Sequence, residues 1–418
     1  MTAHAPGFPE DEVRARARNG TSEIFPPAES YGREMFGAEN LVDDLDQARL
    51  VPPVFMPERL GKLIDLGREP THDDVDLSTV VGGFSSPLPL FLSAFGSTKL
   101  GSAELGIAAS TQAGRLGIPM VIGENVVPVH GYRSAGSPVL NRIDAYLSTV
   151  DATSGGVVVQ QSTEDADSEV WNLVYTSPSS APLLASGRLA FELKIGQGAK
   201  PGLGGMTVLG RESAGGLGGQ FGLHNVFGAD DKVLRCATPG TYTEEIVRQQ
   251  VRFMRNNFPR AKVWVKLHPG RDVAQAAATA WAAGADAVTV DGAEGGTGWA
   301  PLALLRHVGL PLAECLRRIG PPAGCLLVTG RMWEGSRVVR GLALGATAAG
   351  LGRAALLAVS EDAESGLVRL AESLALETRL LISALGKYRP AALCADDLWW
   401  PRTPHTLAAQ PVPVDGLV

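Results

Sequence analysis

Residues 262–298 read KVWVKLHPGRDVAQAAATAWAAGADAVTVDGAEGGTG, and this stretch decides the fold class. An apolar run is followed by a turn with proline and glycine, and then by an alanine-rich stretch of helical character. A second apolar run then ends in a glycine-rich loop. Continuous apolar strands that alternate with helices are typical of a parallel sheet whose two faces are covered by helices. The stretch therefore predicts two parallel strands joined by a helix.

The same alternation extends over residues 88–360, where LPLFLSAFG, IPMVIGEN and GCLLVTGRM each precede a glycine turn. An open doubly wound sheet would concentrate its functional residues at one switch point, whereas a closed (β/α)8 barrel carries them at many strand ends. No GxGxxG motif follows a first strand, which disfavours the open dinucleotide fold. Polar and glycine residues stand at the predicted ends of several strands, namely Gly96, Glu124, Lys266, Asp291 and Gly330. These residues favour the α/β class and a (β/α)8 TIM-type barrel over residues 86–360.

Three regions depart from the barrel pattern. Residues 1–85 predict an N-terminal arm with short lead-in helices, and residues 361–418 predict C-terminal helices and a tail. Between residues 130 and 185, two β-rich runs joined by an acidic turn predict a hairpin-like β-rich insertion. Residues 203–235 are rich in glycine and predict a long loop, and loops of this length are usually functional or mobile.

Composition excludes several classes of function. The 37 basic and 44 acidic residues give a net charge of −7 without a basic stripe, so nucleic acid is not an expected partner. No apolar run reaches the roughly 20 residues that a membrane-spanning helix needs, and no signal peptide is evident, so we expect a cytoplasmic protein. The four cysteines show no metal-ligand spacing, which predicts neither a metal site nor disulfides.

Three features of the predicted mouth have both a functional and a structural interpretation. The glycine turn GLGRAAL, 350–356, precedes a helix whose amides would bind a phosphate group, with Arg331, Arg337 or Arg353 adding charge; plain strand–helix turns are the alternative. Lys266 near the end of an apolar strand would either stabilise negative charge on a flavin ring or form a structural salt bridge. Asp291 and Glu294, in a glycine-rich loop, would act as bases, metal ligands or helix caps; no second carboxylate stands at metal spacing, which disfavours the metal site.

Seven stretches together resemble the FMN-binding synthase domain of the glutamate synthase family, over about residues 45–360. They are SAFGST (93–98), GENV (123–126), ASGR (185–188), ELKIGQGAKPGLGG (192–205), VWVKL (263–267), DGAEGGTG (291–298) and GLGRAAL (350–356). The resemblance implies a (β/α)8 barrel that binds FMN and reduces an imino acid formed from a 2-oxo acid.

The resemblance also implies roles for individual residues. Glu124, Gln197 and Lys200 fall on positions that in the family surround the oxo or imino acid, and Asp291 or Glu124 would handle a proton. The implied FMN-binding residues are Ser93, Ala94, Gly96, Ser97, Lys266, Gly295, Gly296, Thr297, Gly330, Arg331, Gly352 and Arg353.

The sequence departs from the family in ways that bear on activity. It has no cysteine-rich segment for an iron–sulfur cluster and no glutaminase domain, so neither cluster-borne electrons nor ammonia made by this chain is expected. The family's PPPHHD segment is replaced by CATPGTY at 236–242, and DGG.RTG by TGRMWEG at 329–335.

Three functions remain open from the sequence. One is an FMN oxidoreductase acting on a small amino, imino or 2-oxo acid that carries a carboxylate, with dioxygen or a soluble reductant as electron partner. The second is a specialised biosynthetic FMN enzyme that oxidises or rearranges a larger, non-glutamate substrate. The third is a cofactor-free binding barrel. The sequence leaves the oligomeric state open, a homo-oligomer included.

Overall fold

The computed structural model describes residues 9–38, 41–95, 103–124, 138–162, 169–196, 204–214, 222–228, 231–236 and 240–401. Four residues that the sequence assigns to the site lie outside these ranges: Gly96, Ser97, Gln197 and Lys200.

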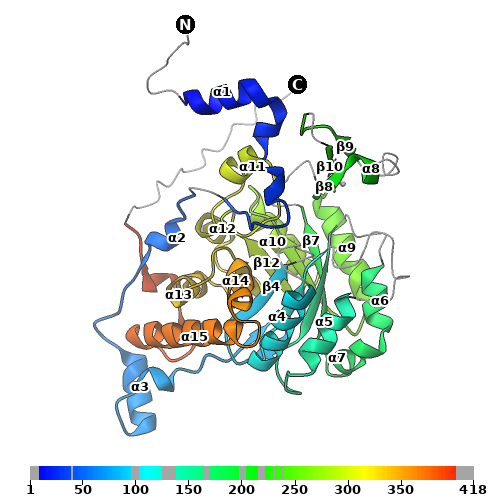
Figure 1. The fold of residues 1–418 in the computed structure, drawn as a ribbon. Helices are drawn as coiled ribbons and strands as arrows, with labels where there is room; N and C mark the ends of the chain where they lie inside the picture. Colours follow the sequence, from blue (N-terminus) through cyan, green and yellow to red (C-terminus); the bar gives the residue numbers. More distant parts are fainter. Residues whose placement is uncertain are drawn as a thin grey trace, which may run out of the picture.

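The described chain is organised around one closed ring of eight parallel strands (Figure 1). In order around the ring they are β4 (Leu90–Phe95), β5 (Met120–Ile122), β6 (Val157–Gln161), β7 (Leu189–Ile195), β11 (Lys262–Leu267), β12 (Ala287–Asp291), β13 (Leu326–Thr329) and β14 (Ala348–Leu351). The last strand pairs with the first in parallel, through Gly350 and Phe91. The predicted (β/α)8 barrel is confirmed.

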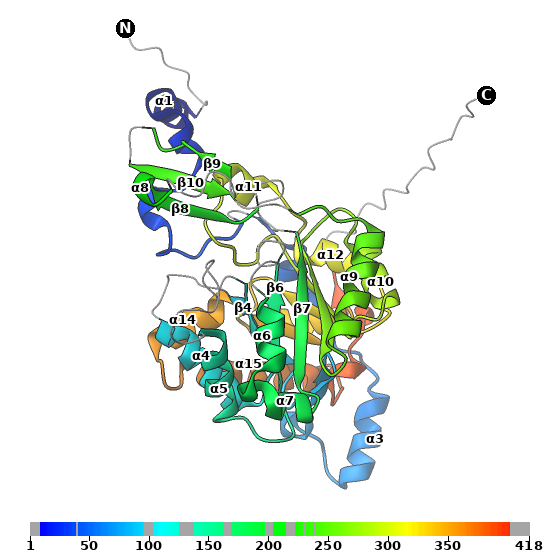
Figure 2. The ribbon, with the colours of Figure 1, turned by 90° about the vertical axis from the view of Figure 1, so that its right-hand side faces the viewer.

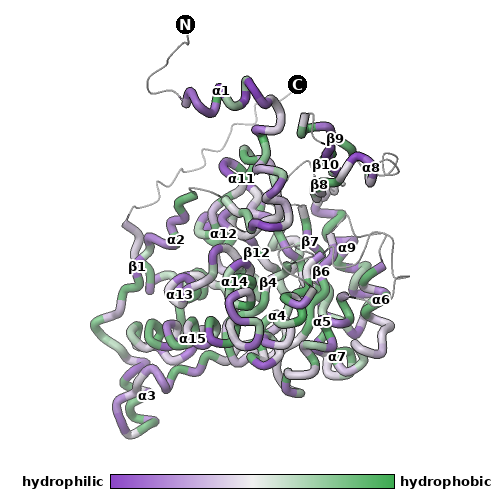
Figure 3. The backbone as a smooth tube through the Cα atoms, in the orientation of Figure 1, coloured by the Kyte–Doolittle hydropathy of each residue, from purple (hydrophilic) through white to green (hydrophobic). Residues whose placement is uncertain are grey.

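Helices follow the strands and cover the outside of the ring. They are α4 (Ala103–Leu116), α5 (Pro138–Leu147), α6 (Val170–Thr176), α7 (Ala181–Ala185), α9 (Glu244–Asn257), α10 (Val273–Ala282), α11 (Leu302–His307), α12 (Leu312–Ile319), α13 (Gly335–Ala343), α14 (Arg353–Glu361) and α15 (Gly366–Ala384). At the start of α9, the Thr243 hydroxyl accepts the Ile246 N–H at 3.2 Å and caps the helix. Figure 3 shows hydrophobic residues gathered in the barrel and its helices.

The interior of the ring is filled at its lower end by one apolar side chain from each strand. They are Phe91, Val121, Val158, Ala190, Trp264, Ala287, Leu327 and Ala348. The hairpin of β2 (Thr79–Val81) and β3 (Phe84–Ser86) closes this end, because Val81 and Phe84 pack against the same cluster. The Trp264 Nε1–H donates to the Gly82 carbonyl at 3.1 Å. Ligand access is thus confined to the opposite end, where the strands finish.

The predicted β-rich insertion lies elsewhere than expected. The prediction is wrong for the described part of residues 130–185, which is 138–162 and 169–185: α5, β6, α6 and α7 lie there, and β6 pairs in parallel with β5 and β7 as a barrel strand. The run VVVQQ is buried along its whole length, and two-sided burial removes the alternation that would tell a barrel strand from a hairpin.

The insertion is formed instead by part of the segment predicted as a loop. Here β8 (Met206–Gly210), β9 (Gly222–His224) and β10 (Lys232–Cys236) form an antiparallel sheet in the order β8, β10, β9, with α8 (Arg211–Ala214) beside them. These short strands were not predicted, because the many glycines between them make the segment read as a loop.

The N-terminal arm packs on this sheet. After its helix α1 (Glu10–Asn19), the Thr21 hydroxyl donates to the Val226 carbonyl of the insertion at 2.9 Å, and Figure 2 shows the arm and the sheet at the same end of the barrel. Phe25 stacks on Trp299 with ring centroids 4.9 Å apart, and Phe227 from the insertion joins the same apolar cluster. We call described residues 9–38 and 204–236 the cap. It lies over the carboxyl ends of the strands, because Thr297, shortly after β12, donates its N–H to the Phe36 carbonyl at 2.9 Å.

The remaining elements lie at the periphery. They are α2 (Asp44–Gln47), α3 (Pro57–Leu66), and the paired strands β1 (Arg49–Leu50) and β15 (Leu398–Trp399). In the part of the chain that the structure describes, no helix has both the length and the hydropathy that crossing a bilayer would take.

We predict that Gly82→Ala destabilises the barrel. A Cβ on Gly82 would lie 2.2 Å from the Trp264 ring, and φ is +55° there. Overpacking of this kind costs about 1–3 kcal/mol beyond the backbone strain. The matched control is Gly20→Ala, where φ is +64° and no atom lies within 4 Å of the added Cβ. Urea unfolding should show a larger loss for the Gly82 variant; equal losses would contradict this packing.

Candidate active site

A ring of polar side chains lies directly above the apolar ring inside the barrel. Successive strand residues face opposite sides of a sheet, so the residue two positions after each member of the apolar ring also faces inward. We call these side chains the polar floor: Ser93, Gln160, Glu192, Lys266, Thr289 and Thr329, each with 8% or less of its surface exposed. The mouth of the barrel is therefore polar at its base.

Lys266 and Asp291 form an ion pair at this level. The Lys266 Nζ lies 2.9 Å from the Asp291 Oδ2. Burial lowers the pKa of the Lys266 ammonium, but the carboxylates of Asp291 and Glu192 outweigh it, and the pKa lies above its ordinary value. Lys266 therefore carries a fixed positive charge in a nearly dry environment.

A second ion pair, Glu124 with Lys194, lies next to the first. Lys194 on β7 is the register partner of Lys266 on β11. Burial raises the pKa of the Glu124 carboxyl, but Lys194 outweighs it and lowers the pKa to about 2. These two pairs bring two ammonium groups and two carboxylates to the mouth. Sequence reasoning missed Lys194, although it stands two residues after Glu192 in ELKI and so shares its face.

Glu192 is the acid of the polar floor that sequence reasoning also missed. Its carboxylate accepts the Gln160 Nε2–H at 2.5 Å and the Thr289 Oγ1–H at 2.9 Å. Burial raises its pKa above the ordinary range. An acid inside an apolar strand was the available signal, because a buried carboxylate is costly without a role or partners.

The ends of β13 and β14 carry the predicted phosphate-binding turns. Gly352 precedes the first residue of α14, and a Cβ added to it would meet nothing within 4 Å. Arg353 is partly buried; burial, and then the nearby Arg331, lower the pKa of its guanidinium. Two cations beside a helix N-terminus favour an anion in the open space. Thr329, one residue before Gly330, has a buried hydroxyl with no hydrogen-bond partner in the structure.

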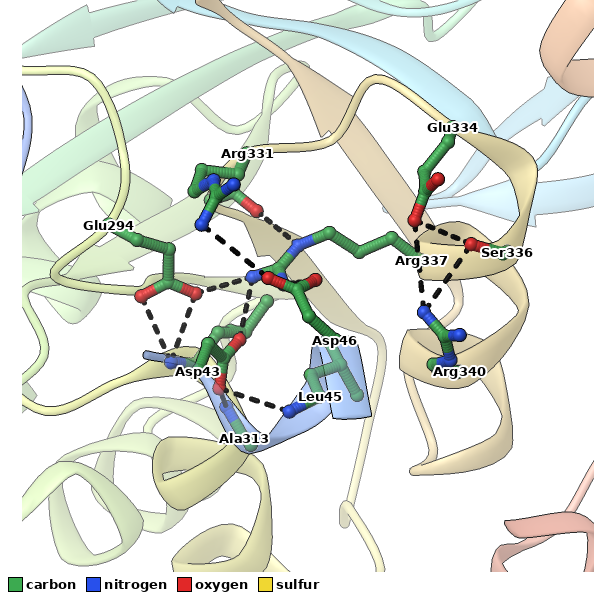
Figure 4. A network of polar contacts seen from close by, with 12 residues as sticks. Asp43, Leu45, Asp46, Glu294, Ala313, Arg331, Glu334, Ser336, Arg337 and Arg340 are labelled. Carbon is green, nitrogen blue, oxygen red and sulfur yellow. Dashed lines mark hydrogen bonds and ion pairs between the residues drawn. The ribbon is translucent and has the colours of Figure 1, made fainter. Parts of the chain in front are cut away.

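The glycine loop after β12 is held from below by a buried charge cluster (Figure 4). The Arg337 Nη2 lies 2.5 Å from a Glu294 carboxylate oxygen and 2.7 Å from one of Asp43. Arg337 also donates from Nε to the Gly330 carbonyl at 2.8 Å and from Nη1 to Asp46 at 2.5 Å. One guanidinium therefore joins the glycine loop, the turn after β13 and the segment around α2.

Glu294 anchors the loop through its other contacts. Its carboxylate accepts the Leu312 N–H at 3.2 Å, and its carbonyl accepts the Arg353 Nη2–H at 2.5 Å. Burial, and then the carboxylate of Asp43, raise the pKa of Glu294 to about 8. The predicted residues Gly295, Gly296 and Thr297 follow in this loop. Gly296 lies against the Arg353 side chain, where a Cβ would be 2.9 Å from Cγ.

The structure therefore brings most of the described predicted residues to one end of the barrel. Lys266, Asp291 and Glu124 lie within a single charged group, with Ser93 in the floor beneath and Ala94 next to it in β4. Gly330, Arg331, Gly352 and Arg353 follow β13 and β14. Among the described residues no cluster of three or more His, Cys, Asp or Glu side chains suits a metal ion.

Comparison with known proteins confirms the resemblance to the glutamate synthase family. Residues 240–362 match the family model described as the conserved region in glutamate synthase. The archaeal-type glutamate synthase [NADPH] of Thermotoga maritima is 34% identical over 197 residues, which cover 43% of this chain and 36% of that protein. The glutamate synthase large subunit-like protein of Rhizobium meliloti is 31% identical over 185 residues, covering 41% and 40%. The chain thus matches less than half the length of these relatives.

Solved structures show the same fold. A double mutant of flavocytochrome b2 with pyruvate bound has a TM-score of 0.57 at 20% identity, over 97% of this chain and 89% of that one. A mandelate oxidase mutant with the monooxide FMN adduct has a TM-score of 0.54 at 19% identity, over 93% and 98%. The barrel architecture is shared with these flavin enzymes.

We predict that Arg337→Met strongly destabilises the protein. Removal of the guanidinium leaves Asp43 and Glu294 buried without a cation, and breaking a buried ion pair in this way costs about 3–5 kcal/mol. Arg369→Met is the control, because Arg369 pairs with Asp362 at an exposed site, where a pair contributes about 1 kcal/mol or less. Denaturant unfolding of both variants would measure the difference, and equal losses would argue against this role of Arg337.

We predict that Glu294 makes stability fall as pH rises. A carboxyl whose folded-state pKa is raised to about 8 stabilises the fold fully below its unfolded pKa of 4.5, and this contribution is lost as pH rises through about 8. The free energy of unfolding should decline over this window in the wild type and decline less in Glu294→Gln. Parallel pH profiles of the two proteins would rule out a raised pKa at Glu294.

Proposed function

We propose that this chain binds FMN in the mouth of the barrel and is an FMN-dependent oxidoreductase of the glutamate-synthase-like type. The observation that carries the proposal is Lys266, a buried cation on the floor of the mouth. A reduced flavin gains negative charge at its N1–C2=O edge, and a fixed cation stabilises that form. The glutamate synthase relatives and the shared architecture with flavin enzymes support the same cofactor.

The residues present suit the cofactor in two respects. The unpartnered Thr329 hydroxyl would gain a hydrogen-bond partner from a ligand on the floor. The open space at Gly352, the amides that begin α14, and the guanidinium groups of Arg331 and Arg353 would hold the phosphate. The glycines at 295 and 296 let the loop pass close to its own backbone and to the Arg353 side chain, since a Cβ on either would lie 2.9 Å from a protein atom.

Bound FMN would supply two-electron chemistry at a substrate carbon. The chain's own residues would do the rest. Asp291, now paired with Lys266, would be positioned to accept or return a proton at a carboxylate oxygen when Lys266 turns to the cofactor. Lys194, held by Glu124 at the same level, would present an ammonium group to a substrate anion.

We propose an amino, imino or 2-oxo acid as the substrate class. Gln197 and Lys200 would bind its carboxylate, and dioxygen or a soluble reductant would serve as electron partner. Polar residues in a closed mouth fix such a small acid by charge and orientation. We also propose that the protein is cytoplasmic and that the chain divides into an N-terminal arm, a barrel and a C-terminal part.

The cap favours a second candidate function, in which the enzyme oxidises a larger substrate or rearranges it without net oxidation or reduction. A three-stranded sheet and the N-terminal arm lie over the end of the barrel at which a substrate would enter. Residues placed above a barrel mouth commonly determine which substrate enters. The altered segment CATPGTY begins at the end of β10, inside this cap.

We predict that the purified chain takes up FMN and that Arg353→Met weakens binding about tenfold or more. The variant loses a charge-assisted hydrogen bond to phosphate, which contributes about 1.5–3 kcal/mol, and 1.4 kcal/mol is a factor of ten in affinity. Titration of flavin fluorescence would measure the dissociation constants, with Arg369→Met as surface control. A chain that binds no FMN contradicts the proposed function.

The substrate class is tested on the FMN-loaded protein. Anaerobic addition of amino acids to the oxidised protein, or of 2-oxo acids with ammonia to the reduced protein, should bleach or restore the visible flavin band. If no amino acid bleaches the flavin band and no 2-oxo acid with ammonia restores it, the larger substrate is favoured.

A further inference from the structure

Glu192 has no role in the chemistry described above, yet burial of its carboxylate costs free energy of folding. Its side chain lies in the polar floor with 1% of the residue exposed. Its two hydrogen-bond donors, Gln160 and Thr289, are both neutral, and among the described residues its carboxylate forms no ion pair. An unpaired carboxylate in a dry environment destabilises the fold unless it can change its protonation state.

The groups around Glu192 come from four other strand ends. β6 contributes the neutral Gln160, and β12 contributes Thr289 together with the carboxylate of Asp291. The ammonium group of Lys266 on β11 is the nearby positive charge that acts on Glu192, but its Nζ is paired with Asp291. Beyond these lie Lys194, on the same strand as Glu192, and Glu124 after β5. One carboxylate of the mouth, Glu192, is thus left without a cation of its own.

A negative charge that develops on a ligand beside Lys266 would upset this balance. In a site of low dielectric constant, like charges a few ångströms apart interact by several kcal/mol. Lys266 is then shared by more anions than it can neutralise. The least costly response is protonation of the acid that has neutral partners and no counter-ion.

We propose that Glu192 is the proton-accepting group of the site, taking up one proton from solvent when bound FMN is reduced and releasing it on reoxidation. The inference rests on the proposed function. In full reduction two electrons and one proton go to the flavin ring, and a second proton forms an O–H bond at a carboxylate oxygen of Glu192. Substrate oxidation supplies the electrons in turnover, and an electrode supplies them in the test.

The consequence is a pH-dependent midpoint potential. Between the pKa of Glu192 with oxidised flavin and its higher pKa with reduced flavin, the wild type takes up two protons per two electrons. Glu192→Gln keeps an amide in the same place and takes up one. The slope of the midpoint potential against pH should therefore halve in this variant over that window, which lies above the ordinary range of a carboxyl because burial raises the pKa of Glu192. Thr289→Val removes one donor to the carboxylate and should move the window to higher pH.

The experiment is a spectroelectrochemical titration of the FMN-loaded full chain at several pH values. Asp397→Asn is the matched control, since Asp397 is a buried carboxylate remote from the mouth and paired with Lys387, and it should leave the slope unchanged. A halved slope in Glu192→Gln alone supports the proposal. An unchanged slope in that variant, or a one-proton slope in the wild type, overturns it.

If Glu192→Gln fails to fold, a one-proton slope in the wild type still overturns the proposal, and the infrared spectrum described below still tests it. Failure to bind FMN, by contrast, refutes the proposed function itself, so the two failures are distinguishable. An infrared difference spectrum on reduction gives an independent readout. It should show a new protonated-carboxyl band in the wild type that is missing in Glu192→Gln, and its absence from the wild type would overturn the assignment.

Discussion

The strict alternation of side chains along eight parallel strands in a closed ring is the constraint on which the rest of the structure depends. Each strand sends every second residue into the interior, so the interior is built in layers. The lower layer is apolar and is sealed by the β2–β3 hairpin. The next layer is polar on most strands, and the charged residues Lys194 and Asp291 follow two positions further along. Because the ring has no edge, polar groups of distant segments meet at one mouth.

Charge balance is the second organising feature, because each charge in this mouth is largely removed from water. Lys266 with Asp291 and Lys194 with Glu124 compensate one another, while Glu192 relies on neutral donors. The same logic holds beneath the glycine loop, where Arg337 compensates Asp43 and Glu294. A buried pair adds little net stability, but it fixes geometry, since separation of the partners would leave a bare charge in the interior. The glycine loop is in this way tied to the chain segment around α2.

Several parts of this arrangement follow from the sequence. The run KVWVKL predicts a buried strand, and Lys266 within it is predicted either to face a flavin or to form a salt bridge; the structure shows a salt bridge with Asp291. The glycine turn at 350–353 predicts the open helix N-terminus observed at Gly352. By contrast, the β-rich insertion was misplaced, because the fully buried β6 lacks the alternation of an exposed hairpin and the short strands of the cap are separated by glycines. Arg337, one of three arginines predicted for the phosphate site, pairs instead with Asp43; the two residues are 294 positions apart, and sequence spacing carries no sign of their contact.

By itself, then, the sequence determined the barrel, its polar strand ends and the likeness to glutamate synthases, because these depend on local patterns: apolar runs, glycine turns and short motifs. Only the tertiary structure decided which charges face one another, which acid lacks a cation, and what covers the mouth. The physical reason is that burial and ion pairing depend on closure of the ring, which joins residues such as Glu192, Lys266 and Thr289 from separate strands into one dry environment. A single strand read along the chain contains no information about the neighbours that closure provides.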